Sequence, residues 1–409
     1  MRIVIYSQAF YPDHSGIPVY SSDFAFYCAQ QGHDVHVITG FPFYPSWKKR
    51  KEDQGKLFRT EQINGITIHR GYIYVPSKPS ALSRIFHELS LFIFSFFNSL
   101  KVKKPDLIVT FTTPILIGVL GSAMKSIWGC KHIINVQDFE LEAALSLGMF
   151  KESMVTRIIE KVEKWSYRKA DYVSSISYGM VDLLRIRKSQ PDDKVIYWPN
   201  WNTTERKGKK SAKGLFRHEF GIPEEKKIIA YAGNIGKKQG LERLIDVAAR
   251  FQDRTDYLFL IIGEGAGLPQ VKQYADRYKL QNLRFLPMLS KEKYQWLLVD
   301  SSAMFVSQAK TQFDVYFPSK VIGILDAGKL LILTADKNSE LYKVAKKFNL
   351  GLVSDYDHPE ELMEQVRQFM DGEVSDDDYS VSRENFVNSF KKEIVLGGIL
   401  DKIDALVKK

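Results

Sequence analysis

Two segments in the second half of the chain have the composition of a diphosphate site. The first, residues 233–240, reads Gly-Asn-Ile-Gly-Lys-Lys-Gln-Gly and follows an apolar segment with a strand pattern. In a strand-to-helix turn of this kind, backbone N–H groups and the helix dipole bind an anion, and lysine adds charge. The Gly-Lys-Ser/Thr ending of an ATPase P-loop is missing. We therefore predict phosphate contacts from Gly233, Asn234, Lys237 and Lys238; a glycine-rich turn with solvated lysines is the alternative.

The second segment, residues 317–320 (Phe-Pro-Ser-Lys), precedes a helical pattern. Proline fits the first turn of a helix, so Ser319 and Lys320 come to its positive end. There they could bind phosphate through N–H, hydroxyl and ammonium groups, although a plain helix start is the alternative. Two such segments in one half predict a single diphosphate at the sheet edge. Residues 263–265 (Gly-Glu-Gly), after another strand, fit an ordinary turn better than a nucleotide contact.

In the first half, polar residues follow two strand patterns. Residues 13–16 (Asp-His-Ser-Gly) come after the first strand, where Gly16 would let a substrate approach the backbone at a helix start. A plain turn is the alternative, and the missing G-x-G-x-x-G pattern argues against a nicotinamide cofactor. Asp138 ends a later strand, where it could be a general base, a sugar-hydroxyl acceptor or a helix N-cap. Asp13 and Asp138 are therefore the candidate catalytic carboxylates, and His14 is a candidate substrate contact.

Alternating strand and helix patterns must position these residues. Expected strands cover 2–7, 35–39, 106–112, 131–136 and 173–177 in the first half, and 227–232, 258–262, 283–286, 303–306 and 330–333 in the second. This alternation predicts an α/β fold with parallel sheets covered on both faces. A chain of 409 residues exceeds a single core. We predict domains 1–199 and 200–384, joined by the polar stretch 198–213, with a C-terminal helix at about 385–409 free to pack back on the first domain.

The composition narrows the function classes. Apolar residues make up 44% of the chain, charged residues 26%, and the net charge is +10. This balance suits anionic partners, but the sequence lacks the patterns of known nucleic-acid modules, so no nucleic acid is expected. Cys28 and Cys130 form neither a disulfide framework nor a zinc site, and the histidines lack metal spacing. We predict no metal or other cofactor, and a cytoplasmic location, because the N-terminus reads as a strand rather than a signal peptide.

A phenylalanine-rich helical pattern at residues 82–100 suggests contact with a membrane. Apolar side chains, Phe92 and Phe96 among them, recur at helical spacing, but the uninterrupted run is too short to span a bilayer. Basic residues at its two ends could bind anionic head groups; these are Arg84, Lys101, Lys103 and Lys104. A buried core helix is the equal alternative.

The order of these features resembles glycosyltransferase family 4, of the GT-B fold, in which two Rossmann-like domains face each other across a cleft. The resemblance rests on the turn ending at Gly16, the pair Gln137-Asp138 and the segments 231–242, 263–265 and 317–329, and it spans nearly the whole chain. Within that family the chain is similar to the branch that holds WcaI of colanic acid biosynthesis and WbuB-like fucosamine transferases.

The resemblance implies a retaining, metal-independent transfer of a sugar from a UDP- or GDP-linked donor. Lys238 and Lys320 would hold the donor diphosphate. The remaining donor candidates are Gly16, Gly233, Asn234, Lys237, Glu264, Gly265, Asp314 and Ser319. The acceptor would be a polyprenyl-diphosphate-linked sugar or a saccharide of bacterial surface polysaccharide synthesis, and the enzyme would be peripheral on the inner face of the cell membrane.

The chain departs from the family pattern at several positions near the donor. Gln137 stands where many members have histidine, and Val315 and Gly323 stand where the family has paired glutamates. Asn234 and Gln239 replace an arginine and a lysine. Two alternatives to the transferase stay open: a GT-B sugar-nucleotide epimerase, and a non-catalytic membrane scaffold that binds a nucleotide-sugar.

Overall fold

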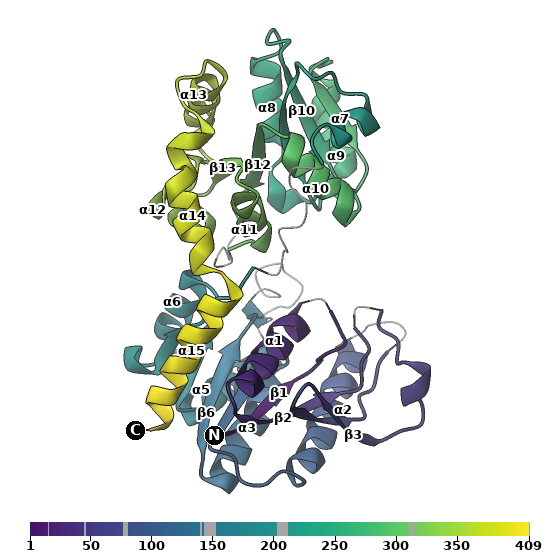
Figure 1. The fold of residues 1–409 in the computed structure, drawn as a ribbon, viewed down its shortest axis with the longest axis vertical. Helices are drawn as coiled ribbons and strands as arrows, with labels where there is room; N and C mark the ends of the chain where they lie inside the picture. Colours follow the sequence, from purple (N-terminus) through teal and green to yellow (C-terminus); the bar gives the residue numbers. More distant parts are fainter. Residues whose placement is uncertain are drawn as a thin grey trace. The chain divides into compact units, whose positions relative to one another are not determined.

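The computed structural model describes residues 1–14, 16–44, 46–76, 81–139, 141–142, 153–202, 212–310, 315 and 317–408. The chain forms two compact α/β units (Figure 1). The first contains Met1–Trp201 together with Glu393–Lys409, and the second contains Asn202–Lys392. The sequence placed this boundary at 199 and the C-terminal return near 385, whereas in the structure the return begins at Glu393.

The first unit contains an eight-stranded sheet in the order β3-β4-β2-β1-β5-β6-β7-β8. Neighbouring strands pair in parallel, apart from the antiparallel hairpin of β3 and β4. The strands are β1 (Arg2–Ser7), β2 (Asp34–Gly40), β3 (Phe58–Ile63), β4 (Ile66–Gly71), β5 (Leu107–Thr112), β6 (Lys131–Val136), β7 (Tyr172–Ser175) and β8 (Val195–Tyr197).

Successive residues of the central strand β1 enter two different cores. Ile3 and Ile5 pack with side chains of α1 and α15, whereas Val4 and Tyr6 pack with side chains of α2 and α3. This alternation places α1 and α15 on one face of the sheet and α2 and α3 on the other, as expected for a parallel sheet. The helices of this unit are α1 (Ile17–Gln30), α2 (Ala81–Ser99), α3 (Ile115–Trp128), α5 (Met154–Lys169), α6 (Tyr178–Ile186) and α15 (Lys392–Val407).

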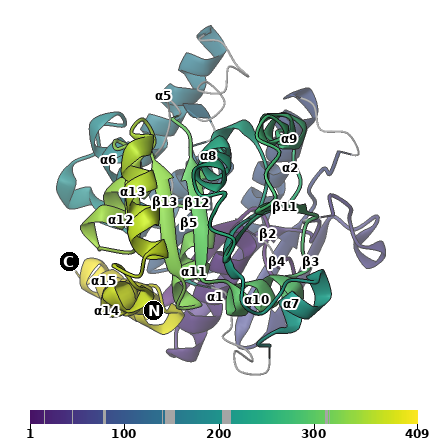
Figure 2. The ribbon, with the colours of Figure 1, turned by 90° about the horizontal axis from the view of Figure 1, so that it is seen from above.

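The second unit contains a six-stranded parallel sheet in the order β11-β10-β9-β12-β13-β14 (Figure 2). Its strands are β9 (Lys227–Ala232), β10 (Tyr257–Ile262), β11 (Leu283–Leu286), β12 (Ala303–Gln308), β13 (Leu330–Ala335) and β14 (Leu352–Asp355). One face packs against α7 (Leu215–Phe220), α10 (Lys291–Asp300), α11 (Ser319–Asp326), α12 (Glu340–Lys347) and α14 (Ser380–Ser389). The other face packs against α8 (Glu242–Arg250), α9 (Leu268–Asp276) and α13 (Pro359–Met370).

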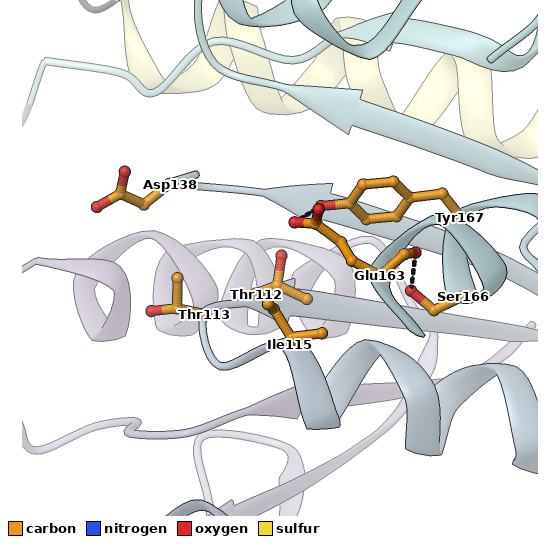
Figure 3. A pocket seen from close by; sticks show the side chains of 7 residues that line it. All are labelled: Thr112, Thr113, Ile115, Asp138, Glu163, Ser166 and Tyr167. Carbon is orange, nitrogen blue, oxygen red and sulfur yellow. Dashed lines mark hydrogen bonds between the residues drawn. The ribbon is translucent and has the colours of Figure 1, made fainter. Parts of the chain in front are cut away.

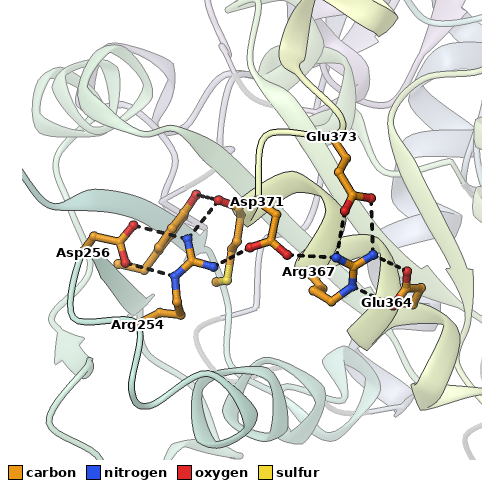
Figure 4. Close-up of polar contacts among 8 residues, drawn as sticks. Arg254, Asp256, Glu364, Arg367, Asp371 and Glu373 are labelled. Carbon is orange, nitrogen blue, oxygen red and sulfur yellow. Dashed lines mark hydrogen bonds and ion pairs between the residues drawn. The ribbon is translucent and has the colours of Figure 1, made fainter.

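Two arginines join the segment before β10 to the end of α13 (Figure 4). Arg254 pairs with Asp256 and with Asp371 at 2.8 Å, and Arg367 pairs with Asp371 at 2.9 Å. Because these pairs lie at the surface, where water and salt screen them, each contributes little to stability. The network lies at the amino end of β10, away from the carboxyl edge that parallel sheets use for ligands.

The strand predictions hold for the central strands of both sheets. The expected bounds 2–7, 131–136 and 227–232 coincide with β1, β6 and β9. The hairpin β3–β4 and the short strands β8 and β14 were not predicted. Strand β3 alternates exposed and half-buried residues at the sheet edge, so it lacks the continuous apolar run that marked the others.

Candidate functional site

The phosphate-binding segments predicted in the second half lie at the carboxyl edge of the second sheet, between β9 and β12. From β9 the chain proceeds to β10 and β11 on one side, and from β12 to β13 and β14 on the other. Ligands of open α/β sheets bind at such a reversal of strand order. The turn after β9 contains residues 233–240, and α11 with Lys320 follows β12. Both segments therefore start from this edge.

Glycines bring the turns after β9 and β10 into backbone contact. The N–H of Ile235 donates to the carbonyl of Glu264 at 2.8 Å. A Cβ on Gly263 would lie 1.8 Å from the carbonyl oxygen of Gly233, and one on Gly265 would lie 2.3 Å from that of Ile235. Both positions have φ above +140°, which side chains disfavour. The turn of residues 263–265 thus packs closely against the turn after β9.

The ammonium group of Lys320 reaches the same turn from the first residues of α11. Its Nζ lies 4.5 Å from the centre of the Tyr231 ring, and a Cβ on Gly233 would lie 3.9 Å from it. The Tyr231 hydroxyl donates to the carbonyl of Asn234 at 2.5 Å, which holds the ring beneath the turn. Burial lowers the pKa of Lys320 to about 8, because loss of hydration disfavours the ammonium. A diphosphate here would supply the opposite charge.

The other two lysines of the turn have exposed side chains. Lys237 and Lys238 lie in a short 3₁₀ helix, and the carbonyl of Lys238 accepts from the N–H of Ala309 at 2.8 Å. Gln239, at the position where the family has lysine, folds back so that its Oε1 accepts from the N–H of Gly236 at 3.0 Å. The charge of this turn therefore lies on the exposed lysines, while the glutamine shapes the backbone.

The structure describes the remaining donor candidates except Asp314. Asn234 and Glu264 are exposed on the turns after β9 and β10. Ser319 is the first residue of α11, and Pro318 precedes it as N-cap with φ −65°, which agrees with the predicted helix start. Asp314 lies outside the described residues. The structure thus brings Lys320 beside Gly233 and packs Gly265 against Ile235, and the roles of all these residues in donor binding stay predictions.

In the first unit, the turn after β1 lies at the reversal of strand order between β1 and β5. Gly16 has φ +73° at the N-cap of α1. Asp13 is buried, and its carboxylate accepts bonds from the N–H groups of Phe43 at 3.4 Å and Tyr44 at 3.3 Å. Burial raises the pKa of Asp13, and these two N–H groups offset part of that rise. Asp13 therefore holds the segment after β2 in place, and its catalytic role stays a prediction. The side chain of the next residue, His14, is exposed.

Asp138 follows the carboxyl end of β6 and lines a small pocket (Figure 3). Its side chain is exposed, and Oδ1 accepts from the N–H of Phe139 at 2.8 Å. The other lining residues are Thr112, Thr113, Ile115, Glu163, Ser166 and Tyr167. In Figure 3 the carboxylate of Asp138 points away from Ser166 and Tyr167, where it can meet solvent or a substrate hydroxyl.

A buried ion cluster lies behind this pocket. Glu163 accepts from the Tyr167 hydroxyl at 2.9 Å and from Lys188 Nζ at 2.5 Å, and Lys188 also pairs with Glu142. Burial acts to lower the pKa of Lys188, but the two carboxylates raise it overall, and burial raises the pKa of Glu163. Sequence reasoning missed the cluster, because its members come from distant segments and each alone reads as a surface residue.

The family's histidine position is occupied by a glutamine that serves the fold. The side-chain amide of Gln137 donates to Asn135 at 2.5 Å and to Asn200 at 3.2 Å, and it accepts from Asn200 at 2.9 Å. These bonds tie the end of β6 to the segment after β8. Asp138 is therefore the residue of this pair that faces solvent.

Helix α2 is buried on one side and exposed on the other, and its contact with a membrane stays a prediction. Phe92 and Phe96 are half-buried against the core of the first unit. The helix and the residue that follows it also expose Ile85, Phe86, Leu89, Ile93, Phe97 and Leu100. The side chains of Arg84, Lys101, Lys103 and Lys104 are also exposed. The open apolar face thus consists of neighbours of Phe92 and Phe96 rather than of these two rings.

The described part of the chain lacks two features that would change the interpretation of the site, a membrane-spanning helix and a metal-binding cluster. Its helices include none with the length and apolar character needed to cross a bilayer. Its His, Cys, Asp and Glu side chains include no group of three arranged to hold a metal ion.

The two sheets and their strand-end turns define a GT-B glycosyltransferase, and comparison with known proteins shows that the chain belongs to this class. The family described as "Glycosyl transferases group 1" matches residues 213–390, and "Glycosyl transferase 4-like domain" matches residues 15–201. The chain is therefore an enzyme that transfers sugars, which decides against the epimerase and scaffold alternatives.

Among relatives, WcaI of Escherichia coli (strain K12), named as a colanic acid biosynthesis glycosyl transferase, is 30% identical over 98% of this chain and 100% of its own length. Sucrose-phosphate synthase of Thermosynechococcus elongatus has a similar structure, with a TM-score of 0.68 and 16% identity over 99% of this chain and 98% of that one. HepE of Anabaena in complex with UDP has a similar structure as well, with a TM-score of 0.67 and 13% identity over 99% of this chain and 100% of that one. At such identities the solved structures show the fold alone.

Proposed function

We propose that this enzyme transfers a sugar, with retention of anomeric configuration and without a metal, from a UDP- or GDP-linked donor bound at the turn after β9. The observation that carries the proposal is Lys320, a largely buried lysine whose ammonium lies against Gly233 and the ring of Tyr231. HepE, which shares the fold, has been solved with UDP and with UDP-glucose.

The chemistry requires stabilisation of a leaving diphosphate. As the bond between the sugar and the diphosphate breaks, negative charge develops on the departing oxygen. A fixed ammonium and preorganised N–H groups in a partly desolvated site stabilise that charge more than water would. Lys320 supplies the ammonium. The N–H groups of Gly233, Ile235 and Gly236 already donate within the fold, so the N–H of Asn234 is the proposed backbone donor of this turn. In this proposal the lysines take the place of a divalent metal.

For the acceptor we propose a polyprenyl-diphosphate-linked sugar or a saccharide of bacterial surface polysaccharide synthesis. The name of WcaI supports the pathway. The exposed apolar face of α2, with Lys101, Lys103 and Lys104 at its end, supports peripheral binding at the inner face of the cell membrane. Asp138, exposed at the end of β6, is the proposed contact or base for the acceptor hydroxyl.

The direct test is release of nucleoside diphosphate. Purified protein is incubated with UDP- or GDP-sugars, with and without a polyprenyl-diphosphate-linked acceptor, and the released nucleotide and the sugar product are measured. Lys320→Ala should lose most of the release, whereas Lys343→Ala, which removes an exposed lysine from α12, should retain it. Near-normal release by Lys320→Ala would contradict the proposed diphosphate site.

A further inference from the structure

Helix α5 in the first unit exposes an apolar stripe. Met154, Ile158 and Trp165 are 79%, 51% and 38% exposed. Their spacing of four and seven residues places them on one side of the helix, within a narrow arc. On the opposite side, Ser166 and Tyr167 are buried. A tryptophan among aliphatic residues on an open helix face is unusual for a surface that only contacts water.

Basic side chains run beside this stripe. Arg157, Lys161, Lys164, Arg168 and Lys169 all belong to α5, and all but Lys164 are exposed. The acidic residues of the helix are Glu160, which pairs with Lys164 at 2.9 Å, and Glu163, which is turned inward to Lys188. The outer face of α5 therefore has a surplus of positive charge next to its apolar centre.

Helix α5 packs in the same layer as α2. Helix α3 contacts both α2 and α5. Ser122 of α3 donates to the carbonyl of Ser166 at 3.1 Å, and Lys125 of α3 donates to that of Lys169 at 2.9 Å. The three helices lie side by side on one face of the sheet, so the sides that they turn away from the sheet form one outer surface. The exposed residues of α2 and α5 flank α3, whose own Ile127 is 64% exposed.

We infer that α5 is a second membrane-contacting helix, and that the outer side of the layer α2–α3–α5 binds an anionic lipid surface. The inference rests on the proposed membrane association and extends it from one helix to a layer. An amphipathic helix with a tryptophan, aliphatic residues and a row of lysines and arginines inserts its apolar side at the head-group level and attracts anionic lipids. Two such helices on either side of α3 fix the orientation of the unit on the bilayer, which one helix alone cannot do.

The test is vesicle binding by the full chain. Flotation or co-sedimentation is measured with phosphatidylglycerol-containing vesicles and with pure phosphatidylcholine vesicles. One variant combines Ile158→Ser with Trp165→Ser, and another combines Lys161→Glu with Arg168→Glu. The matched control combines Val381→Ser with Lys343→Glu, which are exposed residues of the second unit. Thermal melting with and without UDP- and GDP-sugars verifies that each variant folds and binds donor like the wild type.

Each basic residue near an anionic surface contributes about fivefold in affinity, so the charge-reversal pair should weaken binding to phosphatidylglycerol vesicles by roughly tenfold or more. The apolar pair should weaken it as well, and the control should not. If both α5 variants bind vesicles as the wild type does, the inference is overturned. This holds also if an α2 variant, Ile93→Ser with Phe97→Ser, loses binding, because α2 alone would then contact the membrane. If the wild type binds no vesicles but still transfers sugar to a soluble acceptor, the membrane inference fails and the transferase proposal stands.

Discussion

The pH dependence of donor binding follows from the burial of Lys320. With a pKa of about 8, the ammonium form is about nine tenths of the population at pH 7 and about one tenth at pH 9. A bound diphosphate favours the ammonium, so binding at pH 9 must first recover the proton. The apparent affinity for donor should therefore fall about tenfold from pH 7 to pH 9. The diphosphate itself is ionised throughout this range, since phosphate groups titrate near pH 6.

Isothermal titration calorimetry with UDP or GDP, or with the matching nucleotide-sugar, measures this dependence. At pH 9 the wild type should take up close to one proton on binding, which buffers of different ionisation enthalpy reveal. Lys320→Met should bind weakly at pH 7 and show little further loss at pH 9, and Lys320→Arg should bind without the pH slope because its charge persists. A flat wild-type profile, or the same slope in Lys320→Met, would refute the reasoning.

Four further outcomes are expected. The pKa of Lys320 is lower in the folded protein, so the unfolded chain binds more protons between pH 8 and 10.5 and the contribution of Lys320 to the unfolding free energy rises with pH. Lys320→Met should therefore be more stable than the wild type at pH 7, by up to about 3 kcal/mol in urea titrations. Gly265→Ala should destabilise the second unit by about 2 kcal/mol or more and weaken donor binding, because its Cβ meets the Ile235 carbonyl. Asp138→Asn should lower turnover while donor affinity, measured by calorimetry, stays unchanged. Chelator-treated enzyme should keep its turnover, and restoration by added Mg²⁺ or Mn²⁺ alone would contradict the metal-independent proposal.

The central strands and the turn after β9 could be predicted because their signals are local. Strands β1, β6 and β9 lie in the sheet interior and are buried over most of their length, and after β9 glycines and two lysines follow where the chain turns toward the next helix. Each lysine of the proposed site could be recognised from its own short segment, without knowledge of the residues that it contacts. In the structure Lys320 lies beside Gly233, and its role in donor binding stays a prediction.

The edge of the first sheet was missed although its sequence contains a clear hairpin signal. Asn64 and Gly65 have φ of +48° and +82°, and an Asn-Gly pair between two strands is the preferred two-residue hairpin turn. Strand β3 contains Arg59 and Glu61, whose charges obscure its alternation, yet in the structure they pair with each other and with Asp53 and Arg70. Charged residues on an edge strand blunt its tendency to pair with other chains, so their presence there has a physical reason.

The ion cluster behind the pocket of Asp138 could not be predicted, because no local pattern specifies it. Lys188 follows α6, Glu163 lies on α5 and Glu142 follows the end of β6, so only the packed fold brings the three together. Each of these residues is common on helix surfaces. Once buried, however, a lysine with two carboxylates is costly unless all are hydrogen-bonded, so the cluster must form as a unit.

The turn of residues 263–265 shows why a site cannot be assigned from strand ends alone. The strand order reverses between β9 and β12, and β10 lies one strand away from that point, so topology alone does not predict a ligand contact for the turn after β10. Its glycines nevertheless allow a backbone contact with Gly233 and Ile235, at the segment that approaches Lys320. In the proposed site the turn would therefore act on the donor through the shape of the neighbouring backbone. Substitutions of Gly263 or Gly265 should move the phosphate segment itself, whereas substitution of the exposed Glu264 side chain between them should leave that segment in place.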